Sequence, residues 1–453
     1  SNIIVMKKIT KEDFKKYMFK LLQTLIIGVC VGLVVGLYQL IVTNVTTLSR
    51  YLYGNESILL VCVVVIVSIG FAVANNFILK FFPGVDGSGI PNIELGIRGK
   101  KKIEWKFEIL FMAINSFIST FAGFPLGSEG PSVVMAGKIS KMIQDVSKNE
   151  DSDQTAMACG TGFGCAFLSP IAGILYIFEE SLHKFNPQLL LRTLIMMISA
   201  YFVCGLINHH HLLSFNVVEM PNLNDYYVFF ILVVINSLLG MAFAKSIEFV
   251  KRLFTKYKNN FFIKNRGYAL FALVIILNIT CLPLMGSGGV LINNIGTYNT
   301  IWIVILIFLF RFIITILCGS GKVTGGLVIP ILTLGAISGQ IVFLCCNAWF
   351  NLSMDLELII VLVSMCMFFG VVTKTPLTSI ALIYSAILNG TGDYLHGLII
   401  LPIAAITIFM AYFISKICKV DCMYELFMEI TLEDDEKNKI NENNDKIENN
   451  PTK

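Results

Sequence analysis

Long apolar stretches dominate the pattern of hydrophobic and polar positions along this chain. Each approaches the roughly 20 consecutive residues that an α-helix needs to cross a lipid bilayer. The pattern therefore predicts a series of membrane-crossing segments with polar residues gathered between them. These segments lie at about residues 21–42, 58–79, 107–124, 189–207, 227–244, 268–284, 301–317, 327–350, 356–372 and 398–417.

Shorter apolar pieces flanked by glycine and proline lie between these stretches. Residues 131–146, 156–168 and 171–178 are too short for comfortable independent crossings of a bilayer. We therefore expect them to form helices that cross only part of the membrane.

Composition supports the same class of protein. Of the 453 residues, 56% are hydrophobic and only 14% are charged, whereas roughly 25% are charged in a soluble domain. The mean hydropathy is +0.76. A soluble fold could not bury so much apolar surface, so we expect an all-α, polytopic integral membrane protein. The formal net charge of +4 favours neither nucleic acid nor an acidic partner. The 12 cysteines lack C-x-x-C spacing, which is typical of core cysteines rather than ligands.

Basic residues are distributed unevenly enough to orient the chain. Lys and Arg cluster in residues 7–20, 98–106 and 245–266, and none occurs over residues 193–244. By the positive-inside rule the three clusters are cytoplasmic, and the histidines at 209–211 face outward. Both termini are therefore expected in the cytoplasm, with the protein in a bacterial-type plasma (inner) membrane.

The chain is expected to consist of two membrane halves with charged flanks. The C-terminal tail is charged and Asn-rich with hardly an apolar residue, which is typical of disorder, and it is too short to hold a nucleotide-binding regulatory domain. The expected divisions are a cytoplasmic N-terminal segment (1–20), a first membrane half (21–244), a basic cytoplasmic connector (245–266), a second membrane half (267–431) and a disordered cytoplasmic tail (432–453).

An internal repeat relates the two halves. The sequence G-S-G at 87–89 recurs at 286–288, and Pro170 has a counterpart in Pro376 at nearly the same offset. Ordered matches at nearly constant offset indicate two homologous halves, which is the plan of many secondary transporters. If each half crosses the membrane an odd number of times, the halves have opposite orientations.

Three glycine-rich sequences, each containing proline, interrupt the apolar surroundings. They are G-S-G-I-P at 87–91, G-S-E-G-P at 127–131 and G-G-L-V-I-P at 325–330. Glycine lets the backbone bend toward a ligand, and proline is tolerated in the first turn of a helix. The N–H groups and the positive dipole end of each helix then form an anion site without a buried cation. We expect these helix ends to converge in mid-membrane and bind a dehydrated anion.

The motifs, their order and the repeat resemble the CLC family of chloride channels and proton-coupled chloride transporters, over about residues 20–430. The resemblance implies a CLC-like inverted-repeat fold with broken and partly crossing helices. It also implies a homodimer in the lipid bilayer, in which each subunit holds its own ion pathway and needs no cofactor, metal or nucleotide.

The resemblance also assigns an anion site to particular residues. Ser88 and Tyr424 match the hydroxyl groups that coordinate the central anion in this family. Leu327 and Val328 match the positions whose N–H groups complete the site. Val328 replaces the family's phenylalanine, and Thr324 replaces a proline. Serine at the position of Ser88 goes with chloride preference rather than nitrate. The other backbone positions expected beside the anion are Gly89, Ile90 and Gly130.

Two carboxylates match proton-transfer positions of the family. Glu129 matches the external gating glutamate, and a lone carboxylate at membrane depth is functional by default. When ionised, it resembles a halide and can occupy the anion site; when protonated, it loses that attraction and swings aside. Glu180 matches the internal proton glutamate, a position at which many channel members carry an apolar residue. The pair favours exchange of chloride for protons over passive conduction.

The expected function is therefore that of a chloride/proton antiporter, not an enzyme, and three alternatives remain open. One is a passive chloride channel of the same family. Another is a fluoride/proton exchanger, although the fluoride branch usually departs from serine at the position of Ser88. The third is a membrane-embedded metalloenzyme, because Glu180 and His183 have the E-x-x-H spacing of carboxylate-bridged metal sites. The nearest second ligand pair is Asp393 with His396.

Three cationic residues lie at membrane depth outside these motifs. Lys322 lies next to the third motif, where its charge would raise the local potential for anions. Arg311 and Lys374 lie in or beside apolar stretches, and we interpret both as snorkelling to helix ends.

Overall fold

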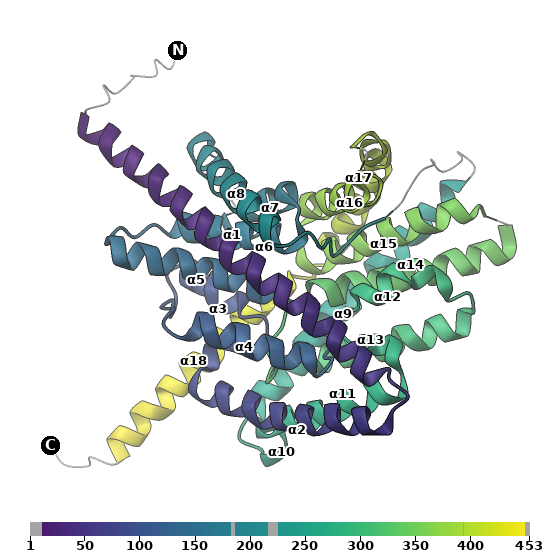
Figure 1. The fold of residues 1–453 in the computed structure, drawn as a ribbon, viewed down its shortest axis with the longest axis horizontal. Coiled ribbons are helices and arrows are strands. Elements are labelled where there is room, and N and C mark those ends of the chain that lie inside the picture. Colours follow the sequence, from purple (N-terminus) through teal and green to yellow (C-terminus); the bar gives the residue numbers. More distant parts are fainter. Residues whose placement is uncertain (1–10, 183–185, 216–224, 351, 393, 449–453) are drawn as a thin grey trace.

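α-Helices account for most of the chain in the computed structural model, which describes residues 11–182, 186–215, 225–350, 352–392 and 394–448 (Figure 1). No β-strand forms within these ranges, so the expected all-α class is confirmed. The helices up to the middle of the chain are α1 (Lys11–Tyr53), α2 (Ile58–Phe81), α3 (Ile90–Ile97), α4 (Glu108–Phe121), α5 (Glu129–Ser147), α6 (Ser152–Phe167), α7 (Pro170–Tyr176), α8 (Pro187–Ile207) and α9 (Tyr227–Lys256). Those that follow are α10 (Phe261–Lys264), α11 (Arg266–Thr280), α12 (Gly289–Asn293), α13 (Ile301–Gly319), α14 (Val328–Phe350), α15 (Met354–Thr373), α16 (Pro376–Thr391), α17 (Tyr394–Ile417) and α18 (Met423–Glu448).

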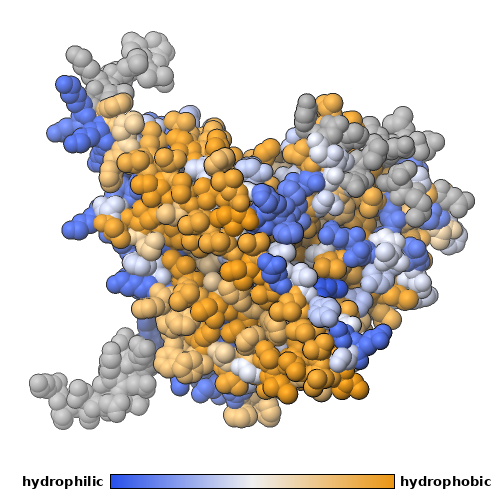
Figure 2. Space-filling view, in the orientation of Figure 1, coloured by the Kyte–Doolittle hydropathy of each residue, from blue (hydrophilic) through white to orange (hydrophobic). Residues whose placement is uncertain are grey.

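Within the described ranges, 8 helices are long and apolar enough to cross a membrane, and α4 and α11 are shorter apolar helices. Together they account for the ten long apolar stretches of the sequence. Many large hydrophobic side chains on them are exposed, and Figure 2 shows a broad hydrophobic surface over α1 and α2. Apolar surface of this extent is stable against lipid rather than water. The chain is therefore an integral membrane protein. The candidate spans are α1, α2, α8, α9, α13, α14, α15 and α17.

The internal repeat is visible in the positions at which helices begin. The starts of α3 and α12 are separated in sequence by the same interval as the starts of α5 and α14. α7 and α16 both begin at a proline, and their separation is nearly equal to that interval. These are the offsets that the glycine and proline motifs predict, so the two halves share one succession of helices.

Among the candidate spans, α14 and α15 of the second half are the most deeply buried. The most apolar 18-residue stretch is 83% buried in α14 and 94% buried in α15. The two helices also pack against each other. α5 packs against α6 in the first half and also contacts α14. The first turns of α5 and α14 are therefore surrounded by protein rather than by lipid.

All four boundaries between the expected segments fall inside helices. α1 already begins at Lys11, and α9 continues to Lys256, into the segment expected to be a connector. The expectation of a disordered tail over 432–453 is wrong for residues 432–448, which continue helix α18. The reason is that acidic residues of α18 form ion pairs with the basic clusters, a compensation that composition does not reveal. These pairs are Arg252–Glu433, Lys258–Asp434 and Lys101–Asp435.

Candidate functional site

The three glycine-rich loops are joined to one another by backbone hydrogen bonds. The N–H of Gly87 donates to the carbonyl of Val323 (3.1 Å), and the N–H of Gly325 donates to the carbonyl of Gly87 (2.9 Å). Gly127 and Gly326 exchange N–H to carbonyl bonds of 2.7 and 2.6 Å. The loop before α14 thus holds the other two loops, one on each side, and the motifs converge at one place as the sequence predicts.

A helix begins directly after each loop. We call the place where the loops at 87–91, 127–131 and 325–330 meet the junction. The close approach of their backbones there requires glycine. A Cβ atom on Gly130 would lie 2.8 Å from the Cα of Gly326 and 3.0 Å from the Cβ of Ser88. Gly89, before α3, has a φ of +70°, in the left-handed region that favours glycine. The first N–H groups of α3, α5 and α14 have no carbonyl partner within their own helices. Their partial positive charges therefore gather around this junction.

The residues expected to surround the anion are buried in this region. Leu327 precedes the first residue of α14, Val328, and both are buried. The N–H of Ile90 lies 3.3 Å from the hydroxyl of Ser88. Tyr424, at the start of α18, is 1% exposed, and its hydroxyl is buried without a hydrogen-bond partner among the described residues. Because an unpartnered buried hydroxyl is costly, this group is well suited to donate to an anion.

Glu129 places its carboxylate at the same junction. The side chain is 1% exposed, and among the described residues it has no ion-pair partner and its Oε2 has no hydrogen-bond partner. The backbone N–H groups of Ser128 and Ile329, at the N-termini of α5 and α14, face the carboxylate. Tyr424 is also an electrostatic neighbour of Glu129. The carboxylate is therefore in the field of the helix ends that we expect to hold a halide.

Glu180 lies in a wide helical turn, Ile177–Leu182, that continues α7, and it is 6% exposed. Its two carboxylate oxygens are each 4.0 Å from the Sγ of Cys422, two residues before Tyr424. Tyr424 and Glu180 are electrostatic neighbours as well. Tyr424 is thus an electrostatic neighbour of both carboxylates that the sequence singles out.

The adjacent Glu179 instead contacts the second repeat. Its carboxylate accepts the N–H groups of Leu377 (2.8 Å) and Thr378 (2.7 Å), so it caps the N-terminus of α16 from the other repeat. Glu179 therefore ties the two halves together, whereas Glu180 is buried beside Cys422.

Two cavities approach the junction from different sides. The first, which we call the Ser88 cavity, has a volume of about 620 Å³ and is lined by residues that include Ser88, Glu108 and Phe427. The second, the Glu129 cavity, has a volume of about 240 Å³ and is lined by residues that include Thr120 and Glu129. Glu108 and Thr120 lie at opposite ends of α4, about 18 Å apart along its axis. The candidate site thus separates two cavities at opposite ends of this helix.

The counterpart loops of the repeat face different cavities. Gly87, Ser88 and Gly89 line the Ser88 cavity, whereas their counterparts, the glycines and serine at 286–288, line the Glu129 cavity. If the two halves have opposite orientations in the membrane, counterpart loops must face opposite sides, as these loops do.

The interpretation of Arg311 as a snorkelling residue is wrong. Its side chain is 0% exposed, and its guanidinium donates to the carbonyls of Leu284, Gly286 and Ser287 at 2.9, 2.7 and 2.6 Å. The loop beside the Glu129 cavity turns its carbonyls inward, and Arg311 satisfies them. Sequence spacing could not predict this contact, because the loop and the arginine belong to separate segments of the chain.

A polar network behind the junction escaped the sequence analysis. The amide of Asn115 on α4 donates to Asn75 on α2 (3.0 Å) and to Thr324 (2.7 Å). Ser119 donates to the carbonyl of Thr324 (2.5 Å). The signal available in the sequence was the presence of asparagines within the apolar segments that form α2 and α4. Thr324, which precedes the paired glycines of the third motif, therefore ties that motif to the first half of the chain.

The pattern of the family described as voltage gated chloride channel matches residues 69–416. The chain belongs to this CLC family. Among its CLC relatives, the H(+)/Cl(-) exchange transporter ClcA of Vibrio cholerae serotype O1 is 29% identical over 319 residues, which is 67% of each chain. ClcA of Vibrio parahaemolyticus is 26% identical over 433 residues, covering 92% of this chain and 90% of that protein.

Solved CLC structures share the fold. A slow cyanobacterial Cl-/H+ antiporter aligns with a TM-score of 0.81 at 22% identity, covering 91% of this chain and 98% of the other. A CLC-type fluoride/proton antiporter aligns with a TM-score of 0.73 at 20% identity, covering 92% and 99%. These likenesses confirm the CLC fold of broken helices, and the relatives are transporters rather than enzymes.

The metalloenzyme alternative rests on Glu180, His183, Asp393 and His396, and of these the structure describes only the side chain of Glu180. His183 and Asp393 lie outside the described residues. Within the part of the chain that is described, no three His, Cys, Asp or Glu side chains gather in a way that could hold a metal ion.

Proposed function

We propose that this protein is a secondary transporter that exchanges chloride for protons. One observation carries the proposal: the buried carboxylate of Glu129 lies where the N-termini of α5 and α14 meet, and Tyr424 is among its electrostatic neighbours. A carboxylate and a halide compete for such a place, because both are stabilised by the same N–H groups and helix dipoles. The curated relatives named above are exchangers of this kind.

In this mechanism the anion moves between the Ser88 cavity and the Glu129 cavity through the junction. The hydroxyls of Ser88 and Tyr424 and the N–H groups of Leu327 and Val328 donate to it, with Gly89, Ile90 and Gly130 shaping the backbone around it. When Glu129 takes up a proton, its carboxyl loses its charge and leaves the site to the anion. Loss of that proton lets the carboxylate return.

Protons reach Glu129 by a separate route in this proposal. Glu180 is buried near Tyr424 and Cys422, on a different element from the loops that line the Ser88 cavity. It would relay protons between the solvent and the interior while chloride passes Ser88. In this proposal chloride and protons enter from the same side by different routes, and the two routes meet at Glu129. The two ions can therefore move in opposite directions.

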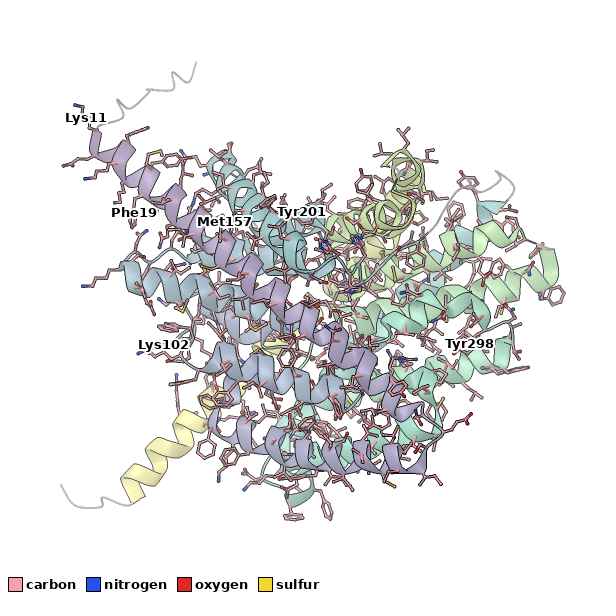
Figure 3. The ribbon with its side chains drawn as sticks, in the orientation of Figure 1. Lys11, Phe19, Lys102, Met157, Tyr201 and Tyr298 are labelled. Carbon is pink, nitrogen blue, oxygen red and sulfur yellow. The ribbon has the colours of Figure 1, made fainter. Side chains whose placement is uncertain are left out.

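We further propose that the Ser88 cavity opens to the cytoplasm. Two basic clusters of the sequence, 98–106 and 245–266, contribute Lys and Arg side chains to its lining, as the positive-inside rule predicts for the cytoplasmic face. Figure 3 shows Lys11 and Lys102 at one edge of the molecule and Tyr298 toward the opposite edge. Tyr298 neighbours Arg50, which lines the Glu129 cavity. The proposal includes an inner bacterial membrane, cytoplasmic termini and a homodimer with one pathway per subunit.

An outward chloride gradient across proteoliposomes tests the exchange. We expect wild-type protein to move protons against their own gradient, followed with a pH dye while a chloride electrode records the anion. Glu180→Gln should retain chloride movement and reduce proton movement by at least about a hundredfold, the lower end of what a positioned acid–base group contributes. The matched control is Glu357→Gln, another buried carboxylate, hydrogen-bonded to Gln340 and outside both cavities. Chloride movement that never drives protons in wild type would mean a passive channel.

A further inference from the structure

One face of α18 lines the Ser88 cavity over about three turns. The lining residues follow one another at intervals of three or four along the helix, as positions on a single helical face do. Phe427 and Asn438, the first and the last of them, are about 16 Å apart along the helix axis. α18 therefore forms a wall of the cavity from near Tyr424 outward. These residues are Phe427, Ile430, Thr431, Asp434, Asp435 and Asn438.

The two ends of this wall are held by different forces. Phe427 and Ile430 are buried, so hydrophobic packing fixes the inner part of α18. No side chain over residues 431–440 is buried, and Ile440 is 58% exposed. We call residues 431–440 the outer segment of α18. Because it has no packed core of its own, polar contacts must hold it against the rest of the protein.

Ion pairs to two separate parts of the chain supply these contacts. The Nζ of Lys101, in the loop after α3, lies 3.0 Å from Asp435 Oδ2. The adjacent Asp434 pairs with Lys258, just past the end of α9. Lys101 and Lys258 both line the cavity, so the outer segment is tied to two stretches of its wall. Two further bonds complete the set: Arg252–Glu433 (3.0 Å) and Lys258–Asn438 (2.7 Å).

The outer segment lies at the open end of the cavity. The side chains of Lys101 and Asp435 are 37% and 40% exposed, whereas Ser88, at the inner end, is buried. The segment bridges the loop after α3 and the end of α9 across this opening. Figure 1 shows α18 (yellow) continuing past the other helices toward the C-terminus. An anion that enters the cavity therefore passes the carboxylates of Asp434 and Asp435.

The sequence of these turns gives the helix little stability of its own. Residues 433–448 are rich in Asp and Asn, which have low helix propensity, and a helix of this length is marginal in water without tertiary contacts. Partly exposed ion pairs are individually weak, and salt screens them. The disorder that the composition predicts is therefore close in free energy to the helix that the ion pairs stabilise.

We propose that the outer segment of α18 is an electrostatic latch, which covers the opening of the Ser88 cavity while its ion pairs hold and frays away when ionic strength rises. This inference rests on the proposed function, because it treats the cavity as the cytoplasmic path of chloride. In the closed latch, Asp434 and Asp435 narrow the opening and repel anions. In the frayed state both carboxylates leave the opening, so chloride exchange becomes faster. The transporter therefore responds to the salt content of the cytoplasm.

Charge reversal at the Lys101–Asp435 pair separates a latch from a simple change of cavity charge. Lys101→Glu and Asp435→Lys alter the charge of the opening in opposite directions, yet each places like charges together and breaks the pair. We expect both to raise the rate of isotopic chloride exchange in proteoliposomes at low ionic strength, by about twofold to fivefold, as for loss of one partly exposed pair. The double variant restores an ion pair of reversed polarity and should return to the wild-type rate.

Ionic strength and hydrogen–deuterium exchange report on the latch independently. An impermeant salt, equal on both sides of the membrane, is raised from about 0.01 M to about 0.15 M, which shortens the Debye length from about 30 Å to about 8 Å. The chloride exchange rate of wild type should rise, whereas that of each single variant should change little. Deuterium uptake by the amides of residues 431–440 should be faster in both single variants and slow again in the double variant. The matched control is Glu436→Lys, at an exposed position of the same turn outside the cavity lining, which should behave as wild type.

Several outcomes would overturn the latch. Opposite effects of the two single reversals would show that cavity charge alone sets the rate. A double variant that remains fast, or deuterium uptake over 431–440 that neither salt nor reversal changes, would also contradict it. Lys258→Glu and Asp434→Lys provide a second pair if a variant of the first folds poorly. Absence of chloride exchange in wild type would refute the proposed function, while deuterium uptake would still test the latch.

Discussion

Replacing Glu129 with glutamine is expected to leave chloride movement intact while abolishing coupled proton movement. The amide has nearly the shape of the protonated carboxyl but can neither ionise nor carry a proton across the junction. Proton flux in proteoliposomes should therefore fall by at least about a hundredfold, and chloride flux should lose its dependence on pH. The measurement is simultaneous recording of pH and chloride during release from loaded vesicles.

The same variant should also bind chloride more tightly in titration calorimetry at neutral pH. In wild type the ionised carboxylate competes with the halide for the N–H groups at the ends of α5 and α14; the amide carries no charge with which to compete. Glu357→Gln is again the control, and it should retain wild-type coupling. Proton transport that persists in Glu129→Gln would place the coupling group elsewhere.

Gly130→Ala is expected to disrupt anion transport through geometry rather than charge. The added Cβ would lie 2.8 Å from the backbone of Gly326 and 3.0 Å from the Cβ of Ser88, distances that real Cβ contacts avoid. Relief requires the loops before α5 and α14 to separate, which moves their N–H groups away from a common centre. We expect chloride flux and chloride affinity to fall by about tenfold or more, since a displacement of about 1 Å can cost a hundredfold at a preorganised site.

Gly70→Ala provides the matched control. Gly70 lies within α2, and an added Cβ there would meet no neighbouring segment within 4 Å, so alanine should preserve transport and stabilise the helix by about 0.5–1 kcal/mol. Thermal unfolding followed by size-exclusion chromatography checks that both variants fold. Gly130→Ala with wild-type flux and affinity would show that close contact of the loops is unnecessary.

The sequence could predict the fold and the meeting of the motifs because both rest on local patterns. Apolar stretches identify spans by length, and glycine followed by proline identifies the breaks at which α3, α5 and α14 begin. The repeat added long-range information, since equal offsets predict paired helices that begin at matching positions, as α5 and α14 do. Opposite orientation of the halves explains why Ser88 and Ser287 line different cavities.

What the sequence could not predict depends on contacts between distant residues. Arg311 is held by carbonyls of a loop whose direction no spacing reveals. Thr324 looked like a simple departure from the family pattern, but it anchors a network with Asn75 and Asn115 that only the packing of α2 against α4 creates. The tail beyond residue 432 has the composition of a disordered segment, yet its acidic residues meet basic clusters far away in the chain.

Crystallographic anomalous scattering from bromide tests the central claim most directly, because it locates a chloride substitute without assuming any transport mechanism. In crystals of Glu129→Gln soaked in bromide, the account predicts an anomalous peak within hydrogen-bonding distance of the Ser88 and Tyr424 hydroxyls and of the N–H groups at the start of α14. A map in which bromide occupies other parts of the protein but leaves this junction without a peak would contradict it.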